Sequence, residues 1–217
     1  SVDNSSAVAF SADRAAGNIG LHVDGNLLSA GDYRIPGNSN ANPSNGPGDT
    51  GRLSFSGNRE NNLGIGASLI QSWGYVGASI SQIDKLYGVH GRDESSKIDL
   101  QQNRFDLDSL IRSPFAGFDS IRFKLGQTEY QHTELQSGID PHVKFTNRAL
   151  ESRVELSHQA MAGWRGRLGF QTDGSTVQAL DLNHVGESTV PRTRSSSIAV
   201  FIVEETDIGA VRLNAGA

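Results

Sequence analysis

Histidine and carboxylate side chains lie close together at two points in the chain, and this combination could bind a transition-metal ion. His90 is followed closely by Asp93 and Glu94. Imidazole and carboxylate groups are common ligands of zinc and related ions. The spacing is not diagnostic by itself. The alternative interpretation, a solvated polar loop, therefore stays open.

The second point is built on an extended segment. His132 and Glu134 are two residues apart, so on a strand they face the same way, and Asp140 and His142 follow. These residues could capture an ion, or they could be ordinary polar residues of a strand face. The predicted metal candidates are His90, Asp93, Glu94, His132, Glu134 and His142.

Full charges also recur at alternate positions of several segments. Since alternate residues of a strand share a face, we predict a charged face with a ladder of cross-strand ion pairs. The residues of this ladder are Arg104, Asp106, Asp108, Arg122, Lys124, Glu151, Arg153, Glu155, Arg165 and Arg167.

Known catalytic motifs are absent from the sequence. There is no G-x-S-x-G elbow, H-E-x-x-H pair, phosphate-binding loop or G-x-G-x-x-G turn. We therefore predict no enzyme and no cofactor.

Composition narrows the class further. The 217 residues carry a net charge of −5 and no cysteine, which excludes a disulfide scaffold and gives no support to nucleic-acid binding. The longest apolar run, residues 198–203, is too short for a transmembrane helix, which needs ~20 residues. Barrel strands need only ~9–11 residues with apolar side chains at alternate positions.

Period-two alternation recurs along the chain, and its interruptions alternate in length. Short and long connections in strict alternation are typical of an antiparallel up-and-down transmembrane β-barrel. We predict an all-β chain with about ten strands of such a barrel. The short connections are expected at residues 14–17, 71–74, 114–118, 160–163 and 205–209, and the long ones at 32–50, 86–96, 133–144 and 172–192.

The two ends and the aromatic residues fit this prediction. The sequence begins in an alternating segment and stops within another, so residues 1–217 are expected to be part of a larger barrel domain. Trp73, Phe118 and Trp164 lie at predicted short turns, where an aromatic girdle would meet the membrane interface.

An ordered series of short motifs resembles TonB-dependent outer-membrane receptors, with the zinc-receptor-like branch as the nearest subgroup. Each motif is weak alone, but the order and spacing extend from about residue 32 to the end. The segments are 32–37 (DYRIPG), 87–91 (YGVHG), 98–105 (IDLQQNRF), 114–118 (PFAGF), 128–132 (TEYQH) and 153–159 (RVELSHQ).

This resemblance implies import of a scarce metal ion or metal chelate, with zinc or a siderophore complex as cargo, across the outer membrane of a Gram-negative bacterium. It implies a 22-stranded barrel with a plug through which the TonB complex delivers energy. The plug and the later strands lie outside these residues. The charged face would then line the barrel or dock the plug. The sequence departs from the family motif where His90 replaces proline and Arg92 replaces histidine.

Two other classes remain open. One is a passive porin or adhesin-type outer-membrane barrel, which a plug domain would distinguish from a receptor. The other is a soluble secreted β-sheet binding protein, whose apolar face would be sealed inside a protein core.

Overall fold

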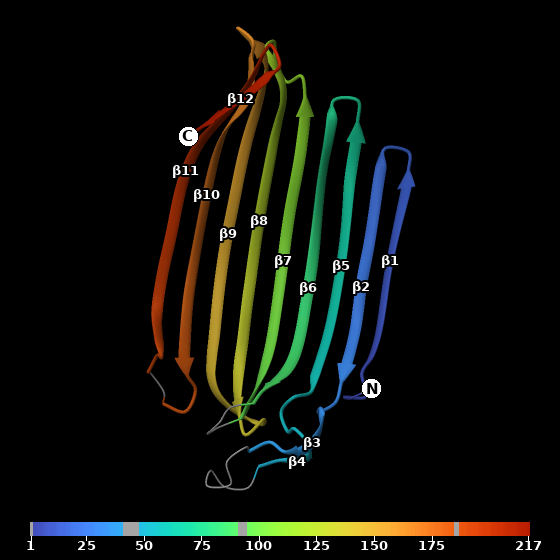
Figure 1. Ribbon diagram of the computed structural model, residues 1–217, viewed down its shortest axis with the longest axis vertical. Coiled ribbons are helices and arrows are strands. Elements are labelled where there is room, and N and C mark those ends of the chain that lie inside the picture. Colours follow the sequence, from blue (N-terminus) through green and yellow to red (C-terminus); the bar gives the residue numbers. More distant parts are fainter. Residues whose placement is uncertain (1, 41–47, 91–94, 185–186) are drawn as a thin grey trace.

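The computed structural model is dominated by one antiparallel sheet of ten strands, in the order β1-β2-β5-β6-β7-β8-β9-β10-β11-β12 (Figure 1). It describes residues 2–40, 48–90, 95–184 and 187–217. The predicted all-β class and the strand number are confirmed. The strands are β1 (Ser6–Ala16), β2 (Ile19–Ala30), β5 (Asn58–Gln71), β6 (Gly74–Val89), β7 (Ser96–Arg112), β8 (Phe118–Gln136), β9 (Asp140–Met161), β10 (Trp164–Asp181), β11 (Val190–Ile208) and β12 (Val211–Gly216).

The sheet is open. Strands β1 and β12 are its two outermost members, and they do not pair with each other. Every sequential neighbour pair in the sheet is antiparallel, so the chain runs up and down without crossovers (Figure 1).

Two short strands outside the main sheet were not predicted. Strand β3 (Arg34–Asn38) pairs with β4 (Thr50–Arg52) within the first long connection. The Asp32 carboxylate joins the start of this connection to its end, because it accepts hydrogen bonds from the backbone N–H groups of Ser56 and Gly57, at 3.0 and 2.9 Å. Such side-chain to backbone bonds are typical of aspartate in turns.

The connections fall at two ends of the sheet, which we call the turn end and the loop end. The turn end holds the tight connections predicted from the sequence, and the loop end holds the connections at residues 31–57, 90–95, 137–139 and 182–189. Two of the expected long connections were wrong. One was expected over residues 172–192, but β10 continues to Asp181 and β11 begins at Val190. The other was expected over residues 133–144, but β8 and β9 continue to a tight turn at residues 137–139. Ser137 and Gly138 both adopt positive φ there, at 49° and 80°.

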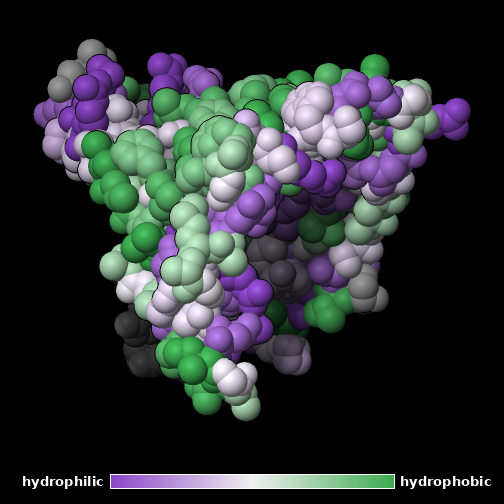
Figure 2. All heavy atoms as spheres, turned by 90° about the horizontal axis from the view of Figure 1, so that it is seen from above, coloured by the Kyte–Doolittle hydropathy of each residue, from purple (hydrophilic) through white to green (hydrophobic). Residues whose placement is uncertain are grey.

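Alternation along the strands gives the sheet two different faces. The apolar face carries Phe105, Leu107 and Ile111 on β7, and the charged face carries the intervening Arg104, Asp106 and Asp108. Figure 2 looks along the strands and shows hydrophilic side chains gathered in the hollow of the curved sheet, with hydrophobic ones over much of its outer surface.

Apolar residues on the apolar face form a band of limited height, which we call the apolar band. One of its cross-strand rows consists of Leu69, Val76, Ser109, Phe123, Val154, Phe170 and Val200. Toward the loop end the band stops at a polar border row, formed by Gln82, Asn103, Glu129, Arg148, Thr176 and Arg194.

Very little of this apolar surface is covered by protein. The only apolar side chains that are buried among the described residues are those of Ile98, Val143 and Ala179, while Ile198 and Val200 are 72% and 74% exposed. Because the described strands form one layer, no second layer packs on the band. The described residues contain no helix long and apolar enough to cross a membrane.

Candidate functional site

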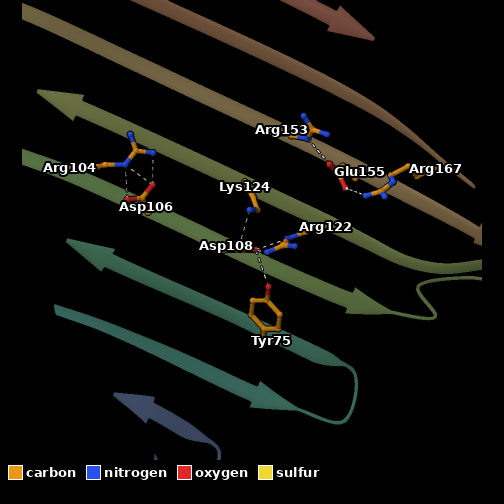
Figure 3. Close-up of polar contacts among 9 residues, drawn as sticks. All are labelled: Tyr75, Arg104, Asp106, Asp108, Arg122, Lys124, Arg153, Glu155 and Arg167. Carbon is orange, nitrogen blue, oxygen red and sulfur yellow. Dashed lines mark hydrogen bonds and ion pairs between the residues drawn. The ribbon is translucent and has the colours of Figure 1, made fainter. Parts of the chain in front are cut away.

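The charged face is organised around Asp108, which lies on β7 between two neighbouring strands (Figure 3). Its carboxylate accepts hydrogen bonds from Arg122 at 3.1 and 2.7 Å and from the Tyr75 hydroxyl at 3.1 Å. Lys124 Nζ lies 3.7 Å from the same carboxylate. Asp108 therefore joins β6, β7 and β8 through side chains.

A second group of charges lies further toward the loop end. The Arg104 guanidinium forms a forked pair with Asp106, at 2.9 and 3.0 Å from Nε, and donates to the Thr128 hydroxyl at 3.0 Å. It also approaches Glu151 of β9 at 3.8 Å. This arginine spans three strands, and its fixed fork suits it to several acceptors at once.

The third group is centred on Glu155 of β9. Arg153 lies 2.5 Å from one carboxylate oxygen, and Arg167 of β10 lies 3.5 Å from the other (Figure 3). Arg153 also stacks on the Phe201 ring, with its guanidinium carbon 4.4 Å from the ring centroid. That ring occupies the space above Gly169, where a Cβ would approach it to 2.1 Å.

Only part of the predicted ladder runs between strands. The Asp108–Arg122, Arg167–Glu155 and Arg165–Glu205 pairs are cross-strand, the last at 2.6 Å. Arg104–Asp106 and Arg153–Glu155 instead join residues two apart on one strand. Residues at i and i+2 share a face, so long arginine side chains reach along a strand as readily as across it.

Between these charges and β1, the floor of the charged face is made of small residues. On β5 and β6 it consists of Gly64, Gly66, Ser68, Gly77, Ser79 and Ser81. At its far side, His22 lies 2.7 Å from Asp13 and 3.0 Å from Asp24, one carboxylate at each ring nitrogen.

The predicted His132 and Glu134 do lie on one face near the loop end. His132 Nε2 is 4.0 Å from the Glu134 carboxylate, and His132 Nδ1 is 2.8 Å from the Tyr130 hydroxyl. The imidazole stacks on Phe145 with 4.4 Å between ring centroids. His132 is therefore held on two sides, with Nε2 directed toward a carboxylate.

His142 lies beside the loop that follows β10. Its Nδ1 is 2.8 Å from the Asn183 amide nitrogen, and its backbone carbonyl accepts a hydrogen bond from Leu182. In the same loop, His184 approaches Asp181 at 3.1 Å. Hydrogen bonds from the His184 side chain and the Asn183 backbone lower the pKa of the Asp181 carboxyl.

The first group of metal candidates is only partly described. His90 has Ser95 as its neighbour, 3.5 Å from Nδ1 to the hydroxyl, and Asp93 and Glu94 lie outside the described residues. Across the described ranges, no cluster of three or more histidine, aspartate or glutamate side chains could hold a metal ion.

One charged pair was missed from the sequence. His158 of β9 lies 3.0 Å from Glu204 of β11 even though β10 runs between them. Both residues pair with Gly166 of β10, where a Cβ would approach the Glu204 carboxylate to 2.7 Å. The only signal in the sequence is a glycine on the strand that lies between the two polar residues. This signal can be used only when the strand register is known.

No model of a known protein family matches the chain.

Proposed function

We propose that the sheet forms part of the wall of a transmembrane β-barrel in the outer membrane of a Gram-negative bacterium. The observation that carries the proposal is the uncovered apolar band, which has a polar border on one side and a charged face behind it. Barrel walls turn an apolar band toward lipid and polar side chains toward the interior.

The height of the band supports this assignment. On β7 it extends from Phe105 to Ile111, so at ~3.3 Å per residue it covers roughly 20–23 Å along the strand. The apolar band of such barrels is about 25 Å tall. Exposed Trp73, Phe115 and Trp164 lie at its turn-end edge, where aromatic girdles meet the membrane interface.

A soluble β-sheet binding protein is less well supported. In a soluble protein the apolar face of an antiparallel sheet packs on another layer. The described strands form one sheet plus the small β3–β4 pair, and large apolar side chains such as Val8 and Ile198 remain 64% and 72% exposed.

Within this architecture, we propose an import receptor that takes up a scarce metal ion or metal chelate with energy from the TonB complex. The support is the ordered motif series, together with the fixed orientation of His132 near Glu134 at the loop end. A bound ion would need further ligands from the cargo or from other parts of the receptor, because the described residues supply too few.

Metal accumulation by living cells tests this proposal. The gene that encodes this chain is expressed in a receptor-deficient strain with and without functional TonB, and zinc, iron and manganese are measured together. We expect one metal to accumulate only when TonB is functional. TonB-independent entry would favour a passive porin, and the absence of any change in uptake would exclude these metals as cargo.

Two variants extend the same measurement to the site. His132→Ala removes the imidazole held by Tyr130 and Phe145, and we expect it to lower uptake. His22→Ala is the matched control, since His22 is already occupied by two carboxylates at the other side of the sheet. Equal uptake by the two variants would remove His132 from the cargo path.

A further inference from the structure

Basic side chains gather on one part of the sheet beyond the apolar band. On the apolar face toward the loop end, β6, β7 and β8 carry charges of both signs, from Asp84, Lys97, Asp99 and Glu129. The neighbouring strands β9 and β11 carry basic residues at the same height. We call these residues, Lys144, Arg148, Arg192 and Arg194, the basic patch.

The two central arginines of the patch are placed to act together. Arg148 and Arg194 both pair with Thr176 of β10, so their backbones are two strand spacings apart, about 10 Å. Guanidinium groups on side chains of this length can converge on one phosphate or diphosphate between them. Arginine also matches phosphate geometry with forked hydrogen bonds.

Little else within the described chain engages these cations. Arg148 has a loose pair with Glu129 at 3.9 Å, and its side chain is 81% exposed. No ion pair joins Arg192, Arg194 or Lys144 to another described residue, and the side chains of Arg192 and Arg194 are exposed.

A groove of about 500 Å³ lies between the arginines and the apolar band. Its lining includes Arg148 and Arg194, the Glu129 that pairs loosely with Arg148, and Thr176, Gly174 and Leu150. A Cβ at Gly174 would meet no heavy atom nearer than 3.9 Å, so the floor is open. Below it, Leu150 is 51% exposed and Ile198 is 72% exposed. A cationic rim directly above an apolar surface fits a molecule with an anionic head and an apolar tail.

We propose that the basic patch binds the phosphorylated headgroup of a membrane lipid, whose acyl chains then lie along the apolar band. This inference rests on the proposed membrane location, because only a bilayer would bring such chains to the band. It goes beyond the import function, since the site lies on the face opposite the charged one. Basic residues at a membrane surface are attracted to anionic lipids.

Native mass spectrometry of the complete protein that contains this sheet, in zwitterionic detergent, tests this site. The probes are diphosphoryl lipid A, phosphatidylcholine and inorganic pyrophosphate. We expect lipid A to bind in preference to phosphatidylcholine, and Arg148→Gln/Arg194→Gln to weaken its binding roughly 30-fold. The control Arg14→Gln/Arg59→Gln removes two exposed arginines of the apolar face outside the patch, and it should bind as the parent chain does.

Protease protection in pure phosphatidylcholine vesicles separates failure of this site from failure of the proposed function. Both double variants should insert as the parent chain does, because this bilayer carries no net charge. Insertion together with equal lipid A binding by all three proteins would overturn the lipid site and leave the membrane assignment standing. Pyrophosphate binding as tightly as lipid A would replace the lipid with free phosphate. Failure of the complete protein that contains this sheet to insert would overturn both proposals.

Discussion

Asp108 shows how one carboxylate can connect three strands of a sheet that has almost no buried core. It accepts from Arg122 and Tyr75 and lies near Lys124, so its neighbours on β6 and β8 are oriented by the same group. Partly exposed ion pairs contribute little individually, but hydrogen bonds to a charged group are stronger than neutral ones.

We therefore expect Asp108→Asn to lower the free energy of unfolding by about 1 kcal/mol, since the arginine loses a charged acceptor while the shape is kept. Urea unfolding in detergent, followed by tryptophan fluorescence, measures this. Asp99→Asn is the matched control, because Asp99 is exposed on the apolar face of the same strand. A loss of the same size in both variants would mean that the Asp108 contacts contribute nothing specific.

The charged residues of this face were predictable, but their partners were not. Alternation alone placed Arg104, Asp106 and Asp108 on one side of β7, and the structure keeps them there. Whether Arg104 pairs along its strand or across it depends on the register and on side-chain reach. The His158–Glu204 pair could not be predicted for the same reason, since it requires Gly166 to pair with both residues.

At the scale of elements, aromatic rings over glycines join neighbouring strands twice. Phe10 of β1 covers Gly25 of β2 on the apolar face, and Phe201 of β11 covers Gly169 of β10 on the charged face. In each pair, the ring fills the space that the missing side chain leaves. Arg153 then stacks on the Phe201 ring, so the glycine indirectly positions a charge.

Gly169→Ala should therefore destabilise the sheet by about 1–3 kcal/mol, the usual cost of overpacking, because the new Cβ would lie 2.1 Å from the Phe201 ring. Thermal unfolding in detergent measures the loss. Gly174→Ala is the control on the same strand, where the nearest heavy atom is 3.9 Å away. If the two alanine variants unfold at the same temperature, the packing of the Phe201 ring does not depend on a glycine at position 169.

The ends of the strands could be predicted from the sequence at the turn end of the sheet but not everywhere at the loop end. The tight connections at the turn end coincide with glycine-containing breaks in the alternation, which makes them predictable. The long connections expected at residues 133–144 and 172–192 failed because polar residues such as Thr133, Lys144 and Thr176 continue the strands beyond the apolar band. Loss of apolar alternation marks the end of the band, and it does not mark the end of the strand.

At the scale of the whole molecule, we expect a new charge to oppose membrane insertion on the apolar face and to have little effect on the charged face. Val200→Lys places a cation within the apolar band, and at the bilayer midplane this should oppose insertion by about 2–4 kcal/mol. Ala199→Lys is the adjacent residue on the charged face, where it pairs with Gln171, and it should be nearly neutral. Folding equilibria in phosphatidylcholine vesicles compare them. Equal penalties for the two lysines would contradict a lipid-facing band.

The open edges carry a separate prediction. All residues of β1 are exposed, and its outer edge presents unpaired backbone groups, as does that of β12. We expect the isolated chain to self-associate in detergent-free buffer, which light scattering after size-exclusion chromatography would detect. A stable monodisperse monomer under these conditions would argue against both the exposed edges and the exposed band as attachment surfaces.

The β3–β4 pair makes one side of the loop end taller than the other. In the sheet register, the last residue of β2, Ala30, is level with Ile98 of β7, which is two residues from the end of that strand. At ~3.3 Å per residue, β2 and β7 therefore end within about 7 Å of each other. The β3–β4 pair lies beyond this level near β2 and β5 (Figure 1). In a membrane, a large solute that approached from the side of β2 would meet this pair before any contact with His132.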